Sequence, residues 1–192
     1  MPPRAATDTP TVLFMGELGQ RKGTWDLVQA IPHVLAAVPG ARFRFGGNGD
    51  EARLRQEIAA LGIEASVDVL GWVGMDKKKA AYDSADIYCL PSYQEGLPMS
   101  ILEAMGSGLP CVSTPIAGIP EAVRDQETGL LVDPGDVPAL TAALTRLCAD
   151  PGLRRRMGTA GRRFAEERFD VDHVVLQLRD IWDDVLQSAN RS

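Results

Sequence analysis

The chain has 192 residues, 45% of them hydrophobic, which is enough to bury one core of ordinary domain size. Its formal net charge of −6 argues against nonspecific binding to nucleic acid or to an anionic membrane surface. The sequence has no apolar run near the roughly 20 residues that cross a bilayer, and with two histidines we expect no metal site.

From residue 11 onward, short apolar runs alternate with segments of helical periodicity. Residues 1–10 lack the apolar segment of a signal peptide and are predicted to be a linker, with residues 11–192 forming one domain. This α/β alternation predicts a Rossmann-like parallel sheet with helices on both faces. The predicted strands are residues 11–15, 41–45, 67–70, 86–90, 109–112 and 129–132. The helices predicted between them are residues 23–38, 50–61, 77–83 and 98–106.

The chain is helical from residue 136, with helices predicted at 137–149, 152–168 and 171–188. Asp170 is a suitable cap for the last helix, so Asp170-Val171-Asp172 is interpreted as a helix start rather than as a D-x-D metal site. A broad apolar stripe runs along this helix and has to be buried against another surface. The stripe consists of Val171, Val174, Val175, Leu178, Ile181, Trp182, Val185 and Leu186.

Ligands of parallel sheets bind at the carboxyl ends of the strands, where the loops of this chain hold glycines and charges. After the first strand, Gly19 lets a ligand approach while Arg21 and Lys22 can neutralise phosphates, although an ordinary loop with solvated charges explains these residues equally well. The Gly-Gly-Asn-Gly run at residues 46–49 is better explained as a tight turn than as a phosphate cradle. For residues 117–121, close approach to a ligand and a plain β–α turn are equal alternatives.

The most specific signal is a pair of acids, Glu95 and Glu103, with a Gly-Leu-Pro turn directly after the first. Pro98 suits the first position of a helix, which places Glu95 on a loop and Glu103 inside that helix. A helix N-terminus attracts an anion, above all a phosphate, and carboxylates accept hydrogen bonds from vicinal hydroxyls. An anion site between two such acids predicts a receptor for a nucleotide sugar.

Two other residue groups have simpler explanations. The lysines at 77–79 suggest contact with nucleic acid, but adjacent helical residues point about 100° apart, so a solvated surface is favoured. The cysteines are odd in number and fall within apolar stretches. They are interpreted as small buried hydrophobes, which suits a reducing, cytoplasmic location. They are Cys89, Cys111 and Cys148.

Together these motifs resemble the C-terminal, donor-binding domain of a retaining glycosyltransferase with the GT-B fold, of the group called group one or glycosyltransferase family four. The resemblance covers nearly the whole chain from residue 11. It rests on residues 86–92 (DIYCLPS), 95–103 (EGLPMSILE), 103–112 (EAMGSGLPCV), 118–121 (GIPE) and 129–132 (GLLV).

The resemblance implies a UDP- or GDP-sugar as donor, transfer of a hexosyl group to a glycan, lipid or other acceptor hydroxyl, and no metal or cofactor. It implies that Glu95 contacts donor-sugar hydroxyls near the reacting carbon and that Glu103 holds the ribose hydroxyls. Lys22 would contact the diphosphate, and the leaving phosphate would take the acceptor proton. Backbone amides and a turn near the base complete the implied site: Gly96, Leu97 and Met99 after Glu95, and Gly71-Trp72-Val73.

The chain departs from this family at Glu17, where an arginine usually pairs with the loop lysine on the phosphates. Two unit charges about 4 Å apart interact by roughly 4 kcal/mol at an effective dielectric constant near 20, so a reversed sign matters there. We expect Arg21 to share the phosphate role with Lys22. The departure also keeps open an alternative, a noncatalytic sugar-nucleotide-binding or regulatory module.

The family carries an N-terminal acceptor domain that should precede residue 11 and that this sequence does not supply. The isolated domain is therefore expected to bind nucleotide weakly and to transfer nothing. Any peripheral membrane association would come through the missing domain. The apolar stripe around Trp182 is expected to be mobile or to form a homodimer contact. Family habit suggests synthesis of envelope polysaccharide or exopolysaccharide.

Overall fold

The computed structural model describes residues 9–189 and contains one sheet in which every pairing is parallel. The strand order is β3-β2-β1-β4-β5-β6, so the direction of winding reverses between β1 and β4. In open sheets of this kind, a crevice forms outside the carboxyl ends of the strands at such a reversal. The strands are β1 (Thr11–Met15), β2 (Arg42–Gly46), β3 (Val67–Gly71), β4 (Ile87–Leu90), β5 (Cys111–Ser113) and β6 (Gly129–Leu131).

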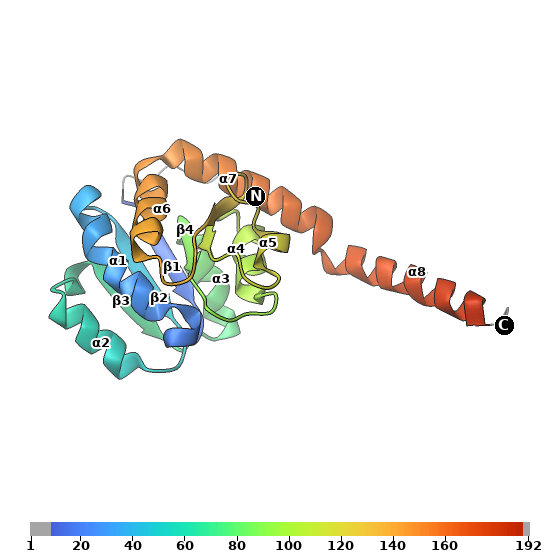
Figure 1. The fold of residues 1–192 in the computed structure, drawn as a ribbon, viewed down its shortest axis with the longest axis horizontal. Coiled ribbons are helices and arrows are strands. Elements are labelled where there is room, and N and C mark those ends of the chain that lie inside the picture. The colour runs from blue at the N-terminus through green and yellow to red at the C-terminus, as the bar shows by residue number, and fades with distance from the viewer. Residues whose placement is uncertain (1–8, 190–192) are drawn as a thin grey trace.

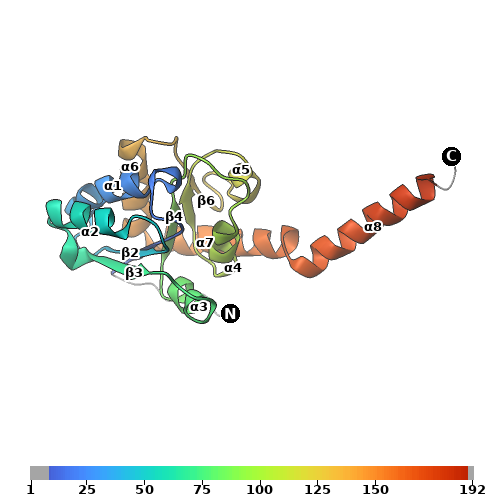
Figure 2. The same ribbon diagram turned by 90° about the horizontal axis from the view of Figure 1, so that it is seen from below.

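Helices cover both faces of the sheet, as predicted. Helices α1 and α6 pack against each other on one face, and α4 packs against α7 on the other (Figures 1 and 2). The helices are α1 (Thr24–Ala37), α2 (Glu51–Ala60), α3 (Met75–Asp83), α4 (Met99–Gly106), α5 (Ile119–Ala122), α6 (Val137–Ala149), α7 (Pro151–Arg168) and α8 (Val171–Ala189).

The core lies on both sides of the central strands. A parallel strand covered on both faces needs a continuous apolar run, and every residue of β4 is buried. The rings of Phe14 in β1 and Phe45 in β2 pack against each other with centroids 5.6 Å apart and planes tilted by 35°. All three cysteines are buried and free, which confirms their interpretation as buried hydrophobes, and burial raises the pKa of each thiol.

The predicted element boundaries need small corrections. Helix α3 begins at Met75, two residues before its predicted start, and β5 begins at Cys111, two residues after its predicted start. The loop at residues 16–22 contains a 3₁₀ turn, Gln20–Lys22, that periodicity did not reveal because one turn is too short for a pattern. The backbone N–H of Asp172 donates to Asp170 Oδ1 at 3.0 Å, which confirms the predicted cap of α8.

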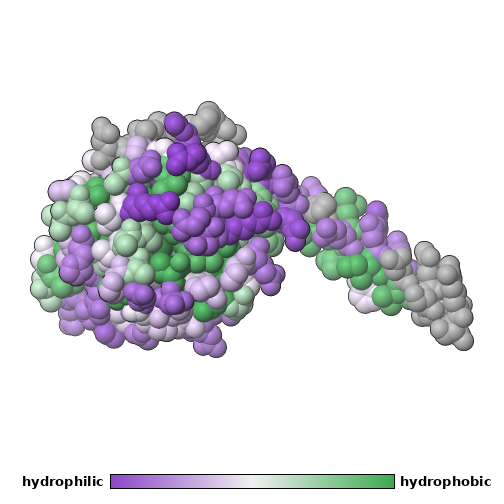
Figure 3. All heavy atoms as spheres, turned by 45° about the horizontal axis from the view of Figure 1, so that its top comes forward, coloured by the Kyte–Doolittle hydropathy of each residue, from purple (hydrophilic) through white to green (hydrophobic). Residues whose placement is uncertain are grey.

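Helix α8 leaves the body of the fold (Figures 1 and 2). None of its described side chains is buried, and Trp182 is 63% exposed. Apolar surface is visible along it in Figure 3. Within residues 9–189, no helix combines the length and the apolar character that crossing a membrane requires. The predicted linker, apart from residues 9 and 10, lies outside the described residues.

Candidate functional site

The loops after β1 and β2 are joined through their backbones. The Gly16 N–H donates to the Gly46 carbonyl at 2.9 Å, and the Leu18 N–H donates to the Asn48 carbonyl at 2.6 Å. Gly47, at φ +145°, comes so close that a Cβ there would lie 1.7 Å from the Gly16 carbonyl oxygen. The glycine-rich run at the end of β2 therefore supports the first loop through close backbone contacts, which account for its glycines without a ligand.

The end of the first loop touches the end of β4. Gly23 has φ +69°, and a Cβ on it would lie 1.9 Å from the Pro91 carbonyl oxygen, so only glycine allows this approach. The Tyr93 N–H donates to the Arg21 carbonyl at 2.9 Å. These contacts tie the start of α1 to the loop after β4, at the point where the sheet reverses.

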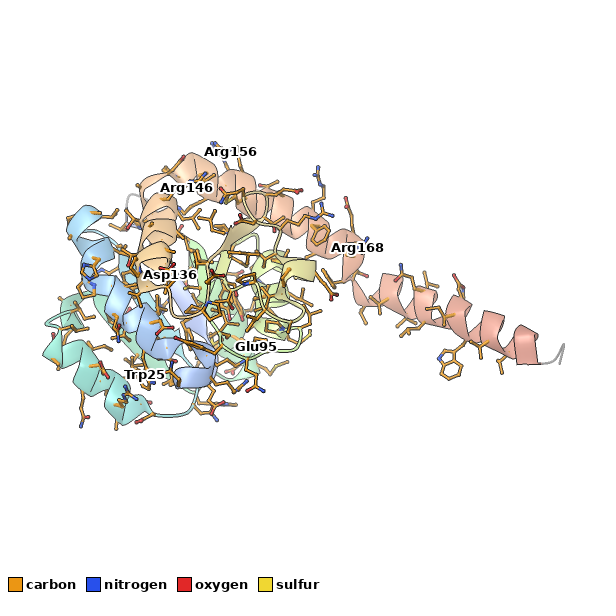
Figure 4. All side chains as sticks on the ribbon, in the orientation of Figure 1. Trp25, Glu95, Asp136, Arg146, Arg156 and Arg168 are labelled. Atoms are coloured by element: carbon orange, nitrogen blue, oxygen red, sulfur yellow. The ribbon has the colours of Figure 1, made fainter. Side chains whose placement is uncertain are left out.

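As a result Lys22 meets Glu95, which is labelled in Figure 4. Lys22 Nζ lies 2.6 Å from Glu95 Oε1, and the two side chains are 14% and 5% exposed. Ser92 Oγ donates to the same oxygen at 2.7 Å. Ser92 is itself buried, and its carbonyl accepts a hydrogen bond from Thr114 Oγ1 at 2.7 Å. The Glu95 carboxylate is thus held in one orientation, and both donors reach Oε1 rather than Oε2.

The turn after Glu95 leads into α4. Pro98 has φ −73° and ψ 118°, so it caps the helix, and its carbonyl accepts from the Ile101 N–H at 3.0 Å. The helix begins at Met99, and placing Pro98 at the first helical position was wrong by one residue. The proline ring restricts φ but leaves ψ open, so the sequence could not separate these two positions. The Ile101 amide is thus satisfied by the cap, whereas the helix supplies no i−4 carbonyl for the amides of Met99 and Ser100.

The loop after β5 supports the same turn. The Gly118 N–H donates to the Gly96 carbonyl at 3.0 Å, and a Cβ on Gly118 would lie 3.2 Å from Leu97 Cβ. For residues 117–121, the two predicted alternatives were close approach to a ligand and a plain β–α turn. The close approach that Gly118 makes is to Gly96 and Leu97 of the protein's own turn, so it does not require a ligand. By contrast, a Cβ on Gly96 or Gly19 would meet no atom within 4 Å, and neither residue has a φ in the left-handed region that favours glycine. The fold does not require glycine at these two positions, and both border open space at the carboxyl edge.

Glu103 lies on α4, about one turn beyond its start. Lys78 Nζ of α3 lies 2.7 Å from Glu103 Oε1, and the Tyr82 hydroxyl donates to Oε2 at 2.9 Å. Burial raises the pKa of Tyr82, so its hydroxyl keeps its proton and remains a donor. The predicted solvated surface is therefore wrong for Lys78, which contacts Glu103. Lys79 forms an exposed ion pair with Asp83 on its own helix.

Glu17 and Arg21 form an ion pair, with Arg21 Nη2 2.7 Å from Glu17 Oε2. The hydrogen bond from Arg21 lowers the pKa of Glu17, and the same bond raises the pKa of Arg21. Both side chains are about half exposed. The negative charge of Glu17, which stands where the family usually has arginine, is therefore balanced within its own loop. Arg21 points to Glu17, and Lys22 points to Glu95.

The turn after β3 reaches the same edge of the sheet. Gly71 has φ +64°. Val73 packs close to the end of β2, since a Cβ added to Gly46 would lie 3.1 Å from Val73 Cγ2. Trp72 is 76% exposed. An exposed aromatic ring beside this edge offers a flat surface on which a planar base could stack.

Ser92, Lys78 and Tyr82 contact the two acids, although no sequence pattern assigned them a role at the site. The spacing of a polar residue three positions before Glu95 was a usable signal for Ser92. No local signal pointed to Lys78 or Tyr82, because α3 and α4 meet only through the tertiary fold. Among the residues that the structure describes, no three His, Cys, Asp or Glu side chains are grouped as metal ligands.

The arrangement defines an α/β protein with a polar site at the reversal point of a parallel sheet. The family described as "Glycosyl transferases group 1" matches residues 2–164, and the chain belongs to this family. The chain is 35% identical over 183 residues to a phosphatidyl-myo-inositol mannosyltransferase of Mycobacterium leprae, covering 94% of this chain and 48% of that protein.

Solved structures of glycosyltransferases share the fold. A sucrose-phosphate synthase of Thermosynechococcus elongatus superposes with TM-score 0.83 at 28% identity, over 94% of this chain and 46% of that one. Anabaena HepE, solved in complex with UDP-glucose, superposes with TM-score 0.81 at 24% identity, over 91% of this chain and 48% of that one. The chain therefore spans about half the length of the relatives it matches.

Proposed function

We propose that this chain is the donor-binding half of a retaining glycosyltransferase that moves a hexosyl group from a UDP- or GDP-sugar to an acceptor hydroxyl of a glycan, lipid or other molecule. The observation that carries the proposal is the largely buried pair of Lys22 and Glu95 at 2.6 Å, beside the N-terminus of α4 and at the reversal point of the sheet. The complex of HepE with UDP-glucose supports a nucleotide sugar as the ligand of this fold.

Lys22 acts at the diphosphate. An ammonium group has three N–H donors, and one of them serves Glu95, so two remain for phosphate oxygens. The backbone amides of Gly96 and Leu97 in the turn before α4 add donors, and the Met99 amide adds the positive end of the α4 dipole. These groups stabilise the negative charge that develops on the departing nucleotide diphosphate, which is the main electrostatic demand of the reaction.

Glu95 acts at the sugar. Ser92 and Lys22 both reach its Oε1, so Oε2 can accept a hydrogen bond from a sugar hydroxyl close to the reacting carbon. Glu103 accepts hydrogen bonds from the ribose hydroxyls at the other end of the donor, and Trp72 and Val73 border the base. The leaving phosphate takes the acceptor proton on the same face of the sugar, so retention needs no separate general base from this half.

The acceptor is bound by a second domain of similar size. The proposal rests on the length of the relatives, of which this chain matches about half. The chain alone is expected to bind donor weakly and to transfer no sugar.

Saturation-transfer NMR of the chain against a panel of UDP- and GDP-sugars tests the proposal. We expect binding in the micromolar to millimolar range, weakened by Glu95→Ala. Absence of binding to every nucleotide at millimolar concentration would overturn the phosphate site.

A noncatalytic sugar-nucleotide-binding module is the second candidate, because Arg21 contacts Glu17 and leaves Lys22 as the cation that faces Glu95. Joining the chain to an acceptor domain of a relative and assaying sugar transfer separates the two functions. Transfer that Glu95→Ala abolishes supports the enzyme, whereas donor binding without transfer supports the module.

A further inference from the structure

Helix α3 supplies two hydrogen-bond donors to Glu103, and each reaches a different oxygen. Lys78 Nζ donates to Oε1 at 2.7 Å, and the Tyr82 hydroxyl donates to Oε2 at 2.9 Å. Lys78 and Tyr82 are four residues apart, so both lie on one face of α3. The two contacts hold the plane of the carboxylate between α3 and α4.

This arrangement leaves the carboxylate able to accept a diol. An ionised carboxylate has about four lone-pair sites, and α3 occupies one on each oxygen. About one site remains on each oxygen, which matches the two O–H groups of a vicinal diol. The Glu103 side chain is 34% exposed, so a ligand can reach these remaining sites.

Lys78 also offsets the charge of Glu103. The negative charge of Glu103 alone would repel a diphosphate bound nearby. The Lys78 ammonium, 2.7 Å from Glu103 Oε1, cancels most of this repulsion at longer range. The Lys78–Glu103 pair is about one-third exposed on each side, and pairs of this kind add little to folding stability. Loss of the Lys78–Glu103 pair should therefore change the affinity for nucleotide more than the free energy of unfolding.

We propose that Lys78 and Tyr82 are positioning residues that aim the Glu103 carboxylate at the ribose diol, so that α3 sets the preference of the site for ribonucleotides over 2′-deoxyribonucleotides. This inference rests on the proposed function, in which Glu103 binds the ribose. A 2′-deoxyribose has one hydroxyl fewer, so it gains less from a correctly aimed carboxylate.

Isothermal titration calorimetry of the 192-residue chain with UDP, GDP and their 2′-deoxy counterparts tests the inference. For Lys78→Met we expect the affinity for the preferred ribonucleotide to fall by about tenfold, the effect of one charge-assisted hydrogen bond. Both ligands carry the diphosphate, so loss of the Lys78 charge should also lower the affinity for the 2′-deoxy counterpart. That decrease should be smaller, because only the ribose diol uses the aimed carboxylate, and the preference for ribose should therefore collapse. Tyr82→Phe removes one neutral donor and should reduce the preference by about threefold. Lys78→Arg, which keeps the charge and the donors, should restore most of it.

Lys79→Met is the matched control, because it removes the same charge from the same helix but breaks the pair with Asp83. It should leave the preference for ribose unchanged. A general loss of positive charge on α3 would weaken ribose and deoxyribose ligands alike, and that result would overturn the inference.

The remaining outcomes are also decisive. If Lys78→Met raises the affinity for the ribonucleotide, Lys78 competes with the diol and the inference is wrong. If the preference for ribose survives both Lys78→Met and Tyr82→Phe but is lost in Glu103→Gln, the proposed role of Glu103 stands and only the positioning role fails. If the unaltered chain binds neither nucleotide at millimolar concentration, the proposed function fails and this inference fails with it.

Discussion

Lys22 and Glu95 are 73 residues apart in the chain, and Lys22 Nζ lies 2.6 Å from Glu95 Oε1 in the structure. The pair joins the loop after β1 to the loop after β4, the two strands between which the sheet reverses its winding. It places one cation and one hydrogen-bond acceptor at the carboxyl edge, where a diphosphate and a sugar hydroxyl would meet.

Breaking this pair should cost stability as well as binding. Lys22→Met leaves the Glu95 carboxylate, 5% exposed, without its cation, and we expect the free energy of unfolding to fall by about 3–5 kcal/mol in urea denaturation. The double variant Lys22→Met/Glu95→Leu should recover most of this loss because neither charge is then buried. It should still bind nucleotide diphosphate poorly. A Lys22→Met chain as stable as the unaltered one would contradict the burial of the pair.

The exposed pair of Glu17 and Arg21 should affect binding and not folding. Glu17→Gln frees the Arg21 guanidinium, and we expect the affinity for nucleotide diphosphate to rise several-fold, an effect that salt weakens. Arg21→Ala should lower the affinity to a similar extent. Neither change should move the melting temperature. Unchanged affinity in Arg21→Ala would remove Arg21 from the phosphate site.

Gly23 should be among the least replaceable residues of the chain. Gly23→Ala combines a φ of +69° with a Cβ placed 1.9 Å from the Pro91 carbonyl oxygen, so the start of α1 has to move. We expect a loss of several kcal/mol, measured by denaturant unfolding. Gly106→Ala is the control, because a Cβ there meets no atom within 4 Å, and it should leave stability unchanged or slightly raised.

Helix α8 should be dispensable for folding. Because none of its described side chains is buried, removing residues 171–192 should leave the melting temperature and nucleotide binding of the body unchanged. If the exposed stripe pairs two chains, analytical ultracentrifugation should show a dimer that this truncation converts to a monomer. A monomeric full chain whose α8 is rigid and protected from hydrogen exchange would contradict the homodimer.

The thiols should be unreactive in the folded protein. Burial raises the pKa of Cys148 to about 12 and raises those of Cys89 and Cys111 further, so near pH 8 almost no thiolate is present and access is blocked. Ellman's reagent should therefore label none of them until denaturant is added. Rapid labelling without denaturant would show that the core opens locally.

Much of the fold could be predicted because its signals are local. A continuous apolar run marks β4 as a strand covered on both faces, and the cap at Asp170 marks the start of α8. The Gly-Leu-Pro turn likewise marks Glu95 as a loop residue and Glu103 as a helical one. In these cases the physical cause lies within a few residues of its effect, so a single sequence contains it.

The sequence by itself therefore determined the α/β alternation, the edge of the sheet that carries the loops, and the acids that define the candidate site. Only the tertiary structure decided which side chains meet there. Lys22 reaches Glu95 because Gly23 packs on Pro91, and Lys78 reaches Glu103 because α3 and α4 are brought together. Such pairings depend on sub-ångström packing between segments that are distant in the chain, and no local pattern in the sequence records them.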